Sequence, residues 1–350
     1  MENILVTGGC GYIGSHVVLG LLKRGFKVTV LDSNINSSPL IIKKIRFLSS
    51  LDKNQFKNKF NFIKGDIRNK KLLEAIFNSN KIKNSKIEAV VHLAGLKSVK
   101  ESLINPVEYW NNNVSGSLSL FEVMLKNSCF NLVFSSSATV YGNPKEIPIL
   151  ENSFTNPINT YGKTKLTVEN IINDLANKYF EELNIIILRY FNPIGAHFSG
   201  LIGENYNFSS GNIFPNILRV ALKKEKYLKI FGNDWQTCDG TAIRDFIHIM
   251  DLAEGHISAI EFLKNNSHVS LTLNLGSGVK TSILDLIKNF ENENHVEIPF
   301  KYFEKRPGDT PILLANCKLA ENTIDWKVER DLAEMCKDGW NFAKINSHMF

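Results

Sequence analysis

A glycine-rich loop near the start of the chain constrains the fold most strongly. The sequence Thr-Gly-Gly-Cys-Gly-Tyr-Ile-Gly places Gly8, Gly11 and Gly14 at a regular spacing. It follows an apolar run that predicts a buried strand over 3–7, and it opens a helix predicted over 12–24. Glycines at these points allow a tight turn, close approach of a pyrophosphate, and close packing of the helix on the strand. Such a loop, in this position, is typical of the first βα turn of a dinucleotide-binding sheet.

Apolar runs and amphipathic segments alternate along the first half of the chain, which indicates strands joined by helices. The predicted strands cover 3–7, 27–31, 60–64, 88–93, 132–135 and 185–189, and the predicted helices cover 12–24, 69–78, 106–126 and 161–179. We therefore predict an α/β fold with a doubly wound parallel (Rossmann-type) sheet and a smaller C-terminal α/β substrate domain. The alternation loosens after residue 192, so the domains are expected at 1–192 and 193–350. Segments near 243–278 are expected to return to the main sheet.

Three polar residues stand where the predicted strands end. Asp32 ends the second strand, where a carboxylate accepts a hydrogen bond from the adenosine ribose and repels a 2′-phosphate. No Arg or Lys follows it directly, so NAD is favoured over NADP. Asp66, followed by Ile67, ends the third strand and suits either the adenine edge or a helix cap. Lys97, after the fourth strand, suits either a phosphate or ribose contact or plain solvation.

Tyr161 and Lys165 lie four positions apart, so on a helix they share one face. A phenol titrates near pH ~10 and is a poor base at neutral pH. We expect the ammonium of Lys165 to favour the phenolate and bring it into a useful range. Ser137, at the end of a predicted strand, offers a hydroxyl to the same substrate oxygen. These three residues predict a site that moves an alcohol's proton while a cofactor takes its hydride.

The composition excludes several other classes of protein. A formal charge of +6, spread over scattered lysines, argues against nucleic-acid binding. Five cysteines without paired spacing favour a reduced, cytoplasmic protein. No apolar run is long enough for a membrane span and no leader is evident, so we expect a soluble chain. The histidines show no metal-ligand spacing, and we expect no metal.

The sequence resembles the extended short-chain dehydrogenase/reductase family, and within it the UDP-galactose 4-epimerases, over nearly the whole chain. Besides the glycine loop and the Tyr161–Lys165 pair, the motifs that carry the resemblance are Ala94-Gly-Leu-Lys97, Asn112-Asn-Val114, Ser135–Gly142, Arg189-Tyr-Phe-Asn-Pro193, Phe231-Gly-Asn-Asp234, Arg244-Asp-Phe-Ile-His248, Asn274-Leu-Gly-Ser-Gly278 and Arg306-Pro-Gly-Asp309. The resemblance implies reversible, NAD-dependent 4-epimerisation of UDP-glucose and UDP-galactose through a 4-keto intermediate. It also implies a homodimer.

The same resemblance implies a role for each matching position. Tyr161 is expected to be the catalytic base, Ser137 its hydrogen-bonding partner, and Lys165 a ribose ligand that biases Tyr161. The expected NAD contacts are Gly8, Gly11, Tyr12, Ile13, Gly14, Asp32, Asn36, Asp66, Ile67, Ala94, Lys97, Asn113, Lys165 and Phe191. The expected UDP-sugar contacts are Ser137, Thr139, Tyr161, Asn192, Asn212, Phe231, Arg244, Arg306 and Asp309. The arginines suit a diphosphate, because their planar forks make charge-assisted contacts.

Related activities are separated by single positions. Sugar-nucleotide dehydratases carry an Asp-Glu pair or a Glu after the strand-end serine or threonine, whereas Ala138 and Thr139 stand here. Neither side chain does carboxylate chemistry, so dehydration is disfavoured. Leu313 stands where relatives carry a bulky Tyr or a small Cys. Epimerisation of UDP-N-acetylhexosamines or UDP-uronic acids therefore stays open as the alternative. A catalytically silent NAD-sensing protein is disfavoured by the intact Ser137, Tyr161 and Lys165.

Overall fold

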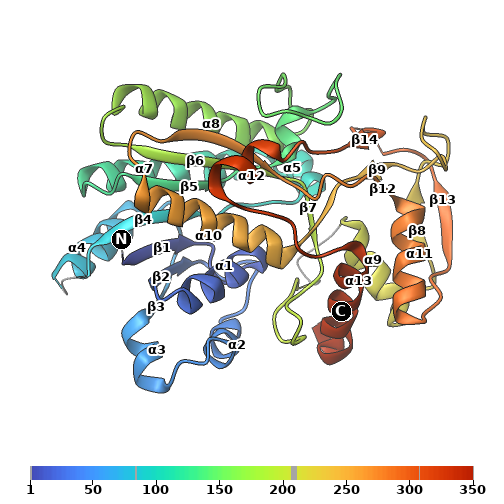
Figure 1. Ribbon diagram of the computed structural model, residues 1–350, viewed down its shortest axis with the longest axis horizontal. Coiled ribbons are helices and arrows are strands. Elements are labelled where there is room, and N and C mark those ends of the chain that lie inside the picture. The colour runs from blue at the N-terminus through green and yellow to red at the C-terminus, as the bar shows by residue number, and fades with distance from the viewer. Residues whose placement is uncertain (1, 83–84, 206–210, 307, 350) are drawn as a thin grey trace.

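The main sheet of the protein is parallel and follows the strand order of a dinucleotide-binding fold. The computed structural model describes residues 2–82, 85–205, 211–306 and 308–349. Within these residues the sheet has seven strands, in the spatial order β11 (Ser270–Leu275), β6 (Asn184–Tyr190), β5 (Asn131–Ser135), β4 (Ile87–His92), β1 (Asn3–Thr7), β2 (Lys27–Asp32) and β3 (Phe60–Lys64). All neighbouring strands are parallel (Figure 1). The order reverses between β1 and β4, which is where such sheets bind ligands.

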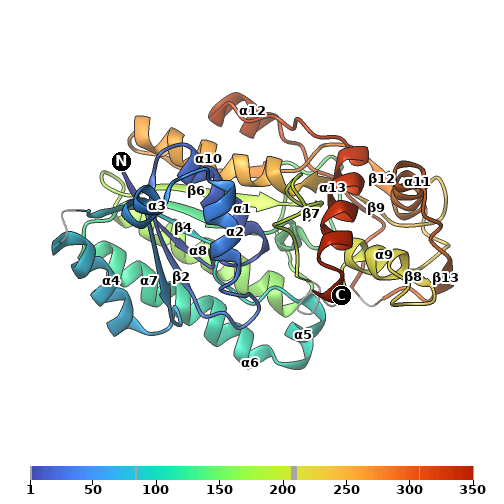
Figure 2. The same ribbon diagram turned by 90° about the horizontal axis from the view of Figure 1, so that it is seen from below.

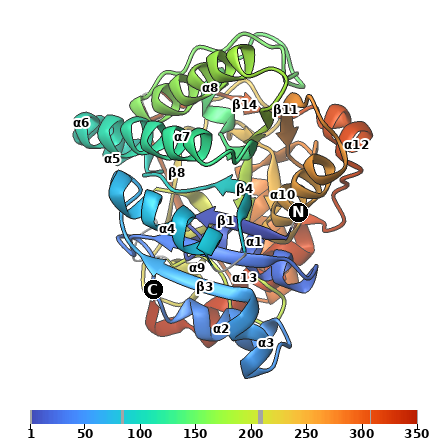
Figure 3. The same ribbon diagram turned by 90° about the vertical axis from the view of Figure 1, so that its left-hand side faces the viewer.

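Both faces of the sheet are buried, as the continuous apolar strands require. Side chains alternate along β1, so that Ile4 and Val6 join one hydrophobic cluster and Leu5 joins another. Helices α1 (Tyr12–Lys23) and α10 (Ile249–Asn265) cover the first face, and α4 (Lys70–Ile82), α7 (Gly116–Lys126) and α8 (Thr160–Lys178) cover the second (Figure 2 and Figure 3). This arrangement confirms the predicted doubly wound sheet.

The remaining helices connect the strands or follow the main sheet. They are α2 (Ile41–Leu48), α3 (Lys53–Lys59), α5 (Val99–Ile104), α6 (Pro106–Tyr109), α9 (Ile213–Ala221), α11 (Ile283–Asn294), α12 (Lys318–Ile324) and α13 (Leu332–Ile345). Short 3₁₀ turns cover Ala138–Tyr141 and Ser347–Met349, and a π-helix covers Trp110–Ser115. Among the described residues, no helix has both the length and the apolar character that a membrane crossing needs.

The chain after residue 192 builds a third hydrophobic cluster, beside the sheet. This cluster joins α9, α11 and α13, which lie side by side (Figure 1). Phe290 and Phe342 lie in it fully buried. Its short strands are β7 (Asn192–Ile194), β8 (Leu228–Phe231), β9 (Ile243–Arg244), β10 (Phe246–His248), β12 (Thr281–Ser282), β13 (Phe300–Phe303) and β14 (Ile312–Leu313). Strand β11 pairs with β6 at the edge of the main sheet, as expected for the returning segment.

Within the first 192 residues, the sequence prediction missed three short α-helices and an irregularity. Helices α2 and α3 lie between β2 and β3, and α5 follows β4, in segments for which no element was predicted. The helix predicted over 106–126 is interrupted by the π-helix. Segments this short are marginal as isolated helices and depend on tertiary packing, which periodicity does not report.

Several histidines lie fully buried within the fold. His92, on β4, bonds Thr7 Oγ1 through Nδ1 and Ser117 Oγ through Nε2, both at 2.8 Å. Burial lowers the pKa of His92 and of His16 to about 3, and that of His197 and of His256 to about 4. These imidazoles are therefore neutral in the folded protein at neutral pH, whereas an unfolded chain protonates them near pH 6.5.

We predict that acid destabilises the fold through these groups. Below pH ~6.5 the unfolded chain binds protons that the native state does not, so the free energy of unfolding falls as the pH falls. Each buried histidine contributes about 1.4 kcal/mol per pH unit at most. Urea unfolding should give a lower free energy of unfolding at pH 5.5 than at pH 7.5. In His92→Asn this decrease should be smaller by about 1 kcal/mol. His268→Asn, at an exposed position, should leave the loss unchanged, and an equal loss in all three proteins would contradict this account.

Candidate active site

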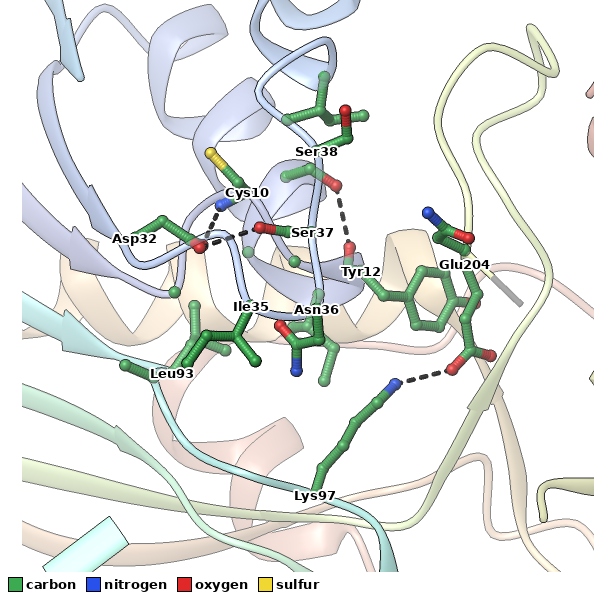
Figure 4. A pocket seen from close by; sticks show the side chains of 18 of the residues that line it. Cys10, Tyr12, Asp32, Ile35, Asn36, Ser37, Ser38, Leu93, Lys97 and Glu204 are labelled. Atoms are coloured by element: carbon green, nitrogen blue, oxygen red, sulfur yellow. Dashed lines mark hydrogen bonds and ion pairs between the residues drawn. The ribbon is translucent and has the colours of Figure 1, made fainter. Parts of the chain in front are cut away.

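A cavity of about 540 Å³ opens at the carboxyl ends of β1, β2 and β4. Its size is that of a small-molecule or cofactor site. Most of the predicted NAD contacts line it, namely Gly8, Gly11, Tyr12, Ile13, Gly14, Asp32, Asn36, Asp66, Ile67, Ala94, Lys97 and Lys165. Tyr161 lines it as well, so the predicted base borders the predicted cofactor site. Figure 4 shows this cavity, with Tyr12, Asp32 and Lys97 around it.

The glycine loop forms one wall because its backbone packs too closely for side chains. A Cβ on Gly14 would lie 2.1 Å from the carbonyl oxygen of Gly8, and one on Gly8 would lie 2.8 Å from the backbone nitrogen of Ala94. Gly8 also has a φ of +74°, which L side chains rarely adopt. The first turn of α1 is thereby held against the ends of β1 and β4. The first N–H groups of a helix have no partner within the helix, so this helix start is a natural place for a phosphate.

Asp32 fixes the loops on both sides of the second strand. Its Oδ2 accepts from the backbone N–H of Cys10 at 2.9 Å. Its Oδ1 accepts from the backbone N–H of Asn34 at 2.8 Å and from Ser37 Oγ at 2.9 Å (Figure 4). A carboxylate offers about four acceptor positions, so acceptor capacity remains on Oδ2. The carboxylate is thus held rigidly and has room for one more hydroxyl.

Other predicted cofactor residues are engaged differently than expected. Asp66 lines the cavity but also pairs with Arg68, whose Nε lies 2.9 Å from Oδ1. Asn113 sits on the π-helix and does not line the cavity. It bonds both backbone groups of Leu96 at 2.8 and 3.0 Å and Thr164 Oγ1 at 3.0 Å, and so holds the loop after β4. Phe191 is buried in the core and is likewise not among the described residues that line the cavity.

Tyr161 and Lys165 occupy the first turns of α8, and both are buried. Asn159 caps the helix by accepting from the Gly162 N–H at 2.8 Å. Ser137 is close enough to the Tyr161 hydroxyl to favour its ionised form, and Ser137 Oγ accepts a hydrogen bond from Thr139 Oγ1 at 3.0 Å. The structure therefore brings the three predicted catalytic residues and Thr139 together.

The electrostatics of this group differ from the sequence expectation. Burial raises the pKa of Tyr161 to about 12, and the hydrogen bond with Ser137 acts in the opposite direction. Lys165 donates from Nζ to the carbonyl oxygen of Ser135 at 2.7 Å, and burial lowers its pKa to about 8. Desolvation therefore outweighs the expected effect of Lys165 on the phenol. A phenolate at this site needs further positive charge or donors beside Tyr161.

A buried ion pair that the site prediction missed fixes the rotation of α8. Glu169, one turn beyond Lys165, accepts from Arg189 on β6, with Nη2 to Oε2 at 2.6 Å and Nε to Oε1 at 3.1 Å. Arg189 Nη1 also donates to the Glu151 carbonyl oxygen at 2.9 Å. Breaking such a pair leaves a buried charge, so the pair resists turning of the helix. Tyr161 and Lys165 are thereby kept on the face that meets the cavity.

The predicted diphosphate ligands gather in a second group around β9. Arg306 donates from Nε to Asp309 Oδ2 at 2.9 Å, and its guanidinium carbon lies 4.7 Å from the centroid of the Phe231 ring. Arg306 Nη1 also lies 3.3 Å from the carbonyl oxygen of Gly211, the residue before Asn212. The charges of Asp309 and Arg306 act on Arg244: Asp309 raises its pKa and Arg306 lowers it. Burial is the larger effect, and it lowers the pKa. The structure thus places these predicted residues near one another. Pro307, within the same motif, lies outside the described residues.

Asp245 ties this second group to the segments around it. Its buried carboxylate accepts from Ser277 N–H at 2.6 Å, from Gly278 N–H at 3.1 Å and from Ala315 N–H at 3.0 Å. Its carbonyl oxygen accepts from the backbone N–H of Asn192 at 3.0 Å. Arg244 and Asn192, both predicted substrate contacts, are therefore positioned through one residue that the site prediction omitted.

Several residues that line the cavity were also missed. Ser37 and Ser38 lie five and six positions after Asp32, close to the strand end, whereas Lys44, Glu204 and Asn346 come from more distant segments. Lys44 donates from Nζ to Asn346 Oδ1 at 2.9 Å, so its ammonium is engaged by the C-terminal segment. Only the tertiary structure brings these distant residues to the cavity.

Comparisons with known proteins agree with this site. A family model described as GDP-mannose 4,6 dehydratase matches residues 5–339. A UDP-glucose 4-epimerase from Cyamopsis tetragonoloba is 44% identical over 347 residues, which is 99% of this chain and 96% of that relative.

Two solved structures are similar over the whole of both chains. One is a UDP-glucose-4-epimerase from Stenotrophomonas maltophila with bound NAD and formylated UDP-arabinopyranose, at 39% identity and a TM-score of 0.93. The other is a UDP-glucose 4-epimerase from Bifidobacterium longum in complex with NAD+ and UDP, at 37% identity and a TM-score of 0.91. With a relative at this identity over nearly its full length, and with a nucleotide-type cleft bordered by Tyr161 and Lys165, the chain belongs to the UDP-glucose 4-epimerase family of extended short-chain dehydrogenases/reductases.

Proposed function

We propose that this protein is an NAD-dependent enzyme that interconverts UDP-glucose and UDP-galactose through a 4-keto intermediate. The observation that carries the proposal is the grouping of the buried side chains of Ser137, Tyr161 and Lys165, the last two at the edge of a dinucleotide-shaped cavity. Membership of the family supports it, since the curated relative and both solved structures are UDP-glucose 4-epimerases. The Stenotrophomonas and Bifidobacterium proteins contain NAD, which supports the same cofactor here.

The residues around the cavity fit NAD. The glycine loop leaves no room for side chains at Gly8 and Gly14, which is the shape that a pyrophosphate on a helix start requires. Asp32 retains acceptor capacity for a ribose hydroxyl and would repel a 2′-phosphate. Lys44, the lysine that lines this cavity in α2, is turned toward Asn346. These features favour NAD over NADP.

In the proposed reaction, Tyr161 removes the proton from O4 of the sugar, and Ser137 holds the same oxygen. Oxidised NAD, held by the residues that line the cavity, would supply a hydride acceptor for C4 and a positive charge near the phenol. With Lys165, that charge would offset the burial that raises the pKa of the phenol. After the 4-keto sugar has rotated to present its opposite face, the same hydride would be returned to C4, and Tyr161 gives its proton back to O4. Electrons and protons balance, so no second substrate is consumed.

The group around β9 is proposed to hold the UDP part. Arg244 and Arg306 supply two cations for the diphosphate, and Phe231, Asn212 and Asp309 surround them. Thr139, which bonds Ser137, and Asn192, which bonds the Asp245 carbonyl oxygen, are proposed to contact the hexose. The matched family model carries a dehydratase description, but Ala138 and Thr139 supply no carboxylate for elimination of water. We therefore propose epimerisation and not dehydration.

The proposal predicts that purified protein carries NAD(H) and interconverts UDP-galactose and UDP-glucose. Tyr161→Phe should lower kcat at least about 100-fold, because the base is lost while UDP binding is kept. Tyr179→Phe, at the other end of α8, serves as the matched control and should keep wild-type turnover. Protein that contains no NAD(H) and does not interconvert the two sugars would refute the function. Unchanged turnover in Tyr161→Phe would remove Tyr161 from its role.

The same assay tests the alternative substrates. Leu313 lies on β14 and pairs with Arg244 on β9, so it stands beside the proposed UDP-sugar group. UDP-N-acetylglucosamine and UDP-glucuronic acid are therefore measured beside UDP-glucose. A higher kcat/KM for either would replace UDP-glucose as the assigned substrate and leave the chemistry unchanged.

We further propose a homodimer, a cytoplasmic location and a division into domains at 1–192, with the returning segments near 243–278, and 193–350. The separate cluster formed by α9, α11 and α13 supports the division. Five free cysteines support a reducing compartment. Exposed apolar side chains on the consecutive helices α5 to α7 support the dimer, and they are Leu103, Ile104, Val107, Trp110 and Leu118. Together they form an apolar face that a second copy can cover.

The dimer predicts a solution mass near twice the chain's 39.6 kDa. Val107→Glu, at a side chain 79% exposed on α6, should shift the mass toward that of a single chain, because it places a charge in the shared interface. Phe47, 74% exposed on α2 at the other face of the sheet, provides the control: Phe47→Glu should leave the solution mass unchanged. Sedimentation equilibrium measures both, and a wild-type protein of single-chain mass would contradict the dimer.

A further inference from the structure

An ion pair reaches across the cavity from one part of the chain to the other. Lys97, in the loop after β4, donates from Nζ to Glu204 Oε1 at 2.7 Å. Glu204 belongs to the segment after β7, and both residues line the cavity (Figure 4). The pair therefore joins the main sheet to the part of the chain that follows residue 192.

The two members of the pair differ in how firmly they are held. The Glu204 side chain is 6% exposed, whereas that of Lys97 is 43% exposed. Glu204 directly follows a backbone bridge between Ala196 and Gly203, and the turn inside it is closed by His197 N–H bonding to the Ile202 carbonyl oxygen at 3.0 Å. A buried carboxylate on a fixed backbone has little freedom, so Glu204 sets the position of the more mobile ammonium.

A second contact crosses in the same direction. The Tyr12 hydroxyl, from the glycine loop, donates to the Gly195 carbonyl oxygen at 2.7 Å. Lys97 Nζ lies 6.0 Å from the centroid of the Tyr12 ring, so the two crossings are neighbours. Both start at residues expected to contact the cofactor, and both end on the 195–204 segment.

We propose that Glu204 is a positioning residue that holds Lys97 across the cavity and slows the escape of NAD. The proposal rests on the proposed function, in which the cofactor is regenerated within each turnover. A dehydrogenase must exchange its cofactor after every cycle, whereas an enzyme that returns the hydride gains nothing by releasing it. A clasp between the two walls of the cavity suits this second need.

Glu204 exerts two effects of opposite sign on a bound dinucleotide. Through its ion pair with Lys97, Glu204 keeps the two walls of the cavity in place, so loss of the Glu204 carboxylate would speed the release of the dinucleotide. As a negative charge it competes with a diphosphate for Lys97, so its loss would slow release. The clasp should dominate, because Lys97 is half exposed and is ordered by its buried partner. Whether loss of Glu204 speeds or slows the release of the dinucleotide therefore shows which of the two effects is larger.

The test measures how fast bound NAD exchanges with isotopically labelled NAD, without substrate, in Glu204→Gln, Lys97→Met and the double variant. We expect each single change to speed exchange about tenfold, the equivalent of one lost ion pair of ~1.4 kcal/mol. The double variant should be no faster than the faster single, since the residues act as one unit. Glu74→Gln, which breaks the exposed Lys126–Glu74 pair of 2.9 Å, should exchange like the wild type.

Slower or unchanged exchange in Glu204→Gln, or additive effects in the double variant, would overturn the proposal while leaving the epimerase function intact. Wild-type protein that binds no NAD would overturn both. If Glu204→Gln does not fold, Lys97→Met decides alone, because its side chain is half exposed: unchanged or slower exchange in that variant overturns the clasp.

Discussion

The close backbone approach between the glycine loop and the end of β4 is the constraint on which the site depends. Gly14 and Gly8 have no space for a Cβ, so the first turn of α1 rests directly on the ends of β1 and β4. At this point the strand order reverses, and the cavity opens beside it. Asp32, Tyr12 and Lys97 meet around the cavity because their strands and loops end there. A side chain at either glycine would push these elements apart.

A second, independent constraint positions the chemistry. The Arg189–Glu169 pair joins α8 to β6 in the protein interior and fixes which face of the helix meets the cavity. Tyr161 and Lys165 are buried there. Burial raises the pKa of Tyr161 and lowers that of Lys165, so it favours the neutral form of both side chains. In the proposed site, the protein's own residues favour the neutral phenol of Tyr161. Added positive charge beside Tyr161 would shift its equilibrium toward the phenolate, which is the base. Catalysis and cofactor binding are thus coupled through electrostatics.

Local patterns predicted the sheet well and distant contacts poorly. The bounds of β1 and β3 were predicted to the residue, because apolar runs ended by polar or glycine residues are read directly from the sequence. The roles expected of Asp32 and Tyr161 followed from their places at a strand end and on a helix face. Glu204, Asp245 and Glu169 had no such local mark, because their partners lie far along the chain. Burial, which reverses the expected direction for the pKa of Tyr161, is likewise a property of the whole fold.

If the hydride that leaves C4 returns to the same carbon, an isotope at that position must survive the reaction. UDP-galactose deuterated at C4 is the direct probe, with the UDP-glucose product analysed by mass spectrometry and proton NMR. Essentially complete retention of deuterium at C4, without transfer to NAD in solution, is the expected result. Loss of the deuterium to solvent would contradict a returned hydride and the roles proposed for Tyr161 and NAD.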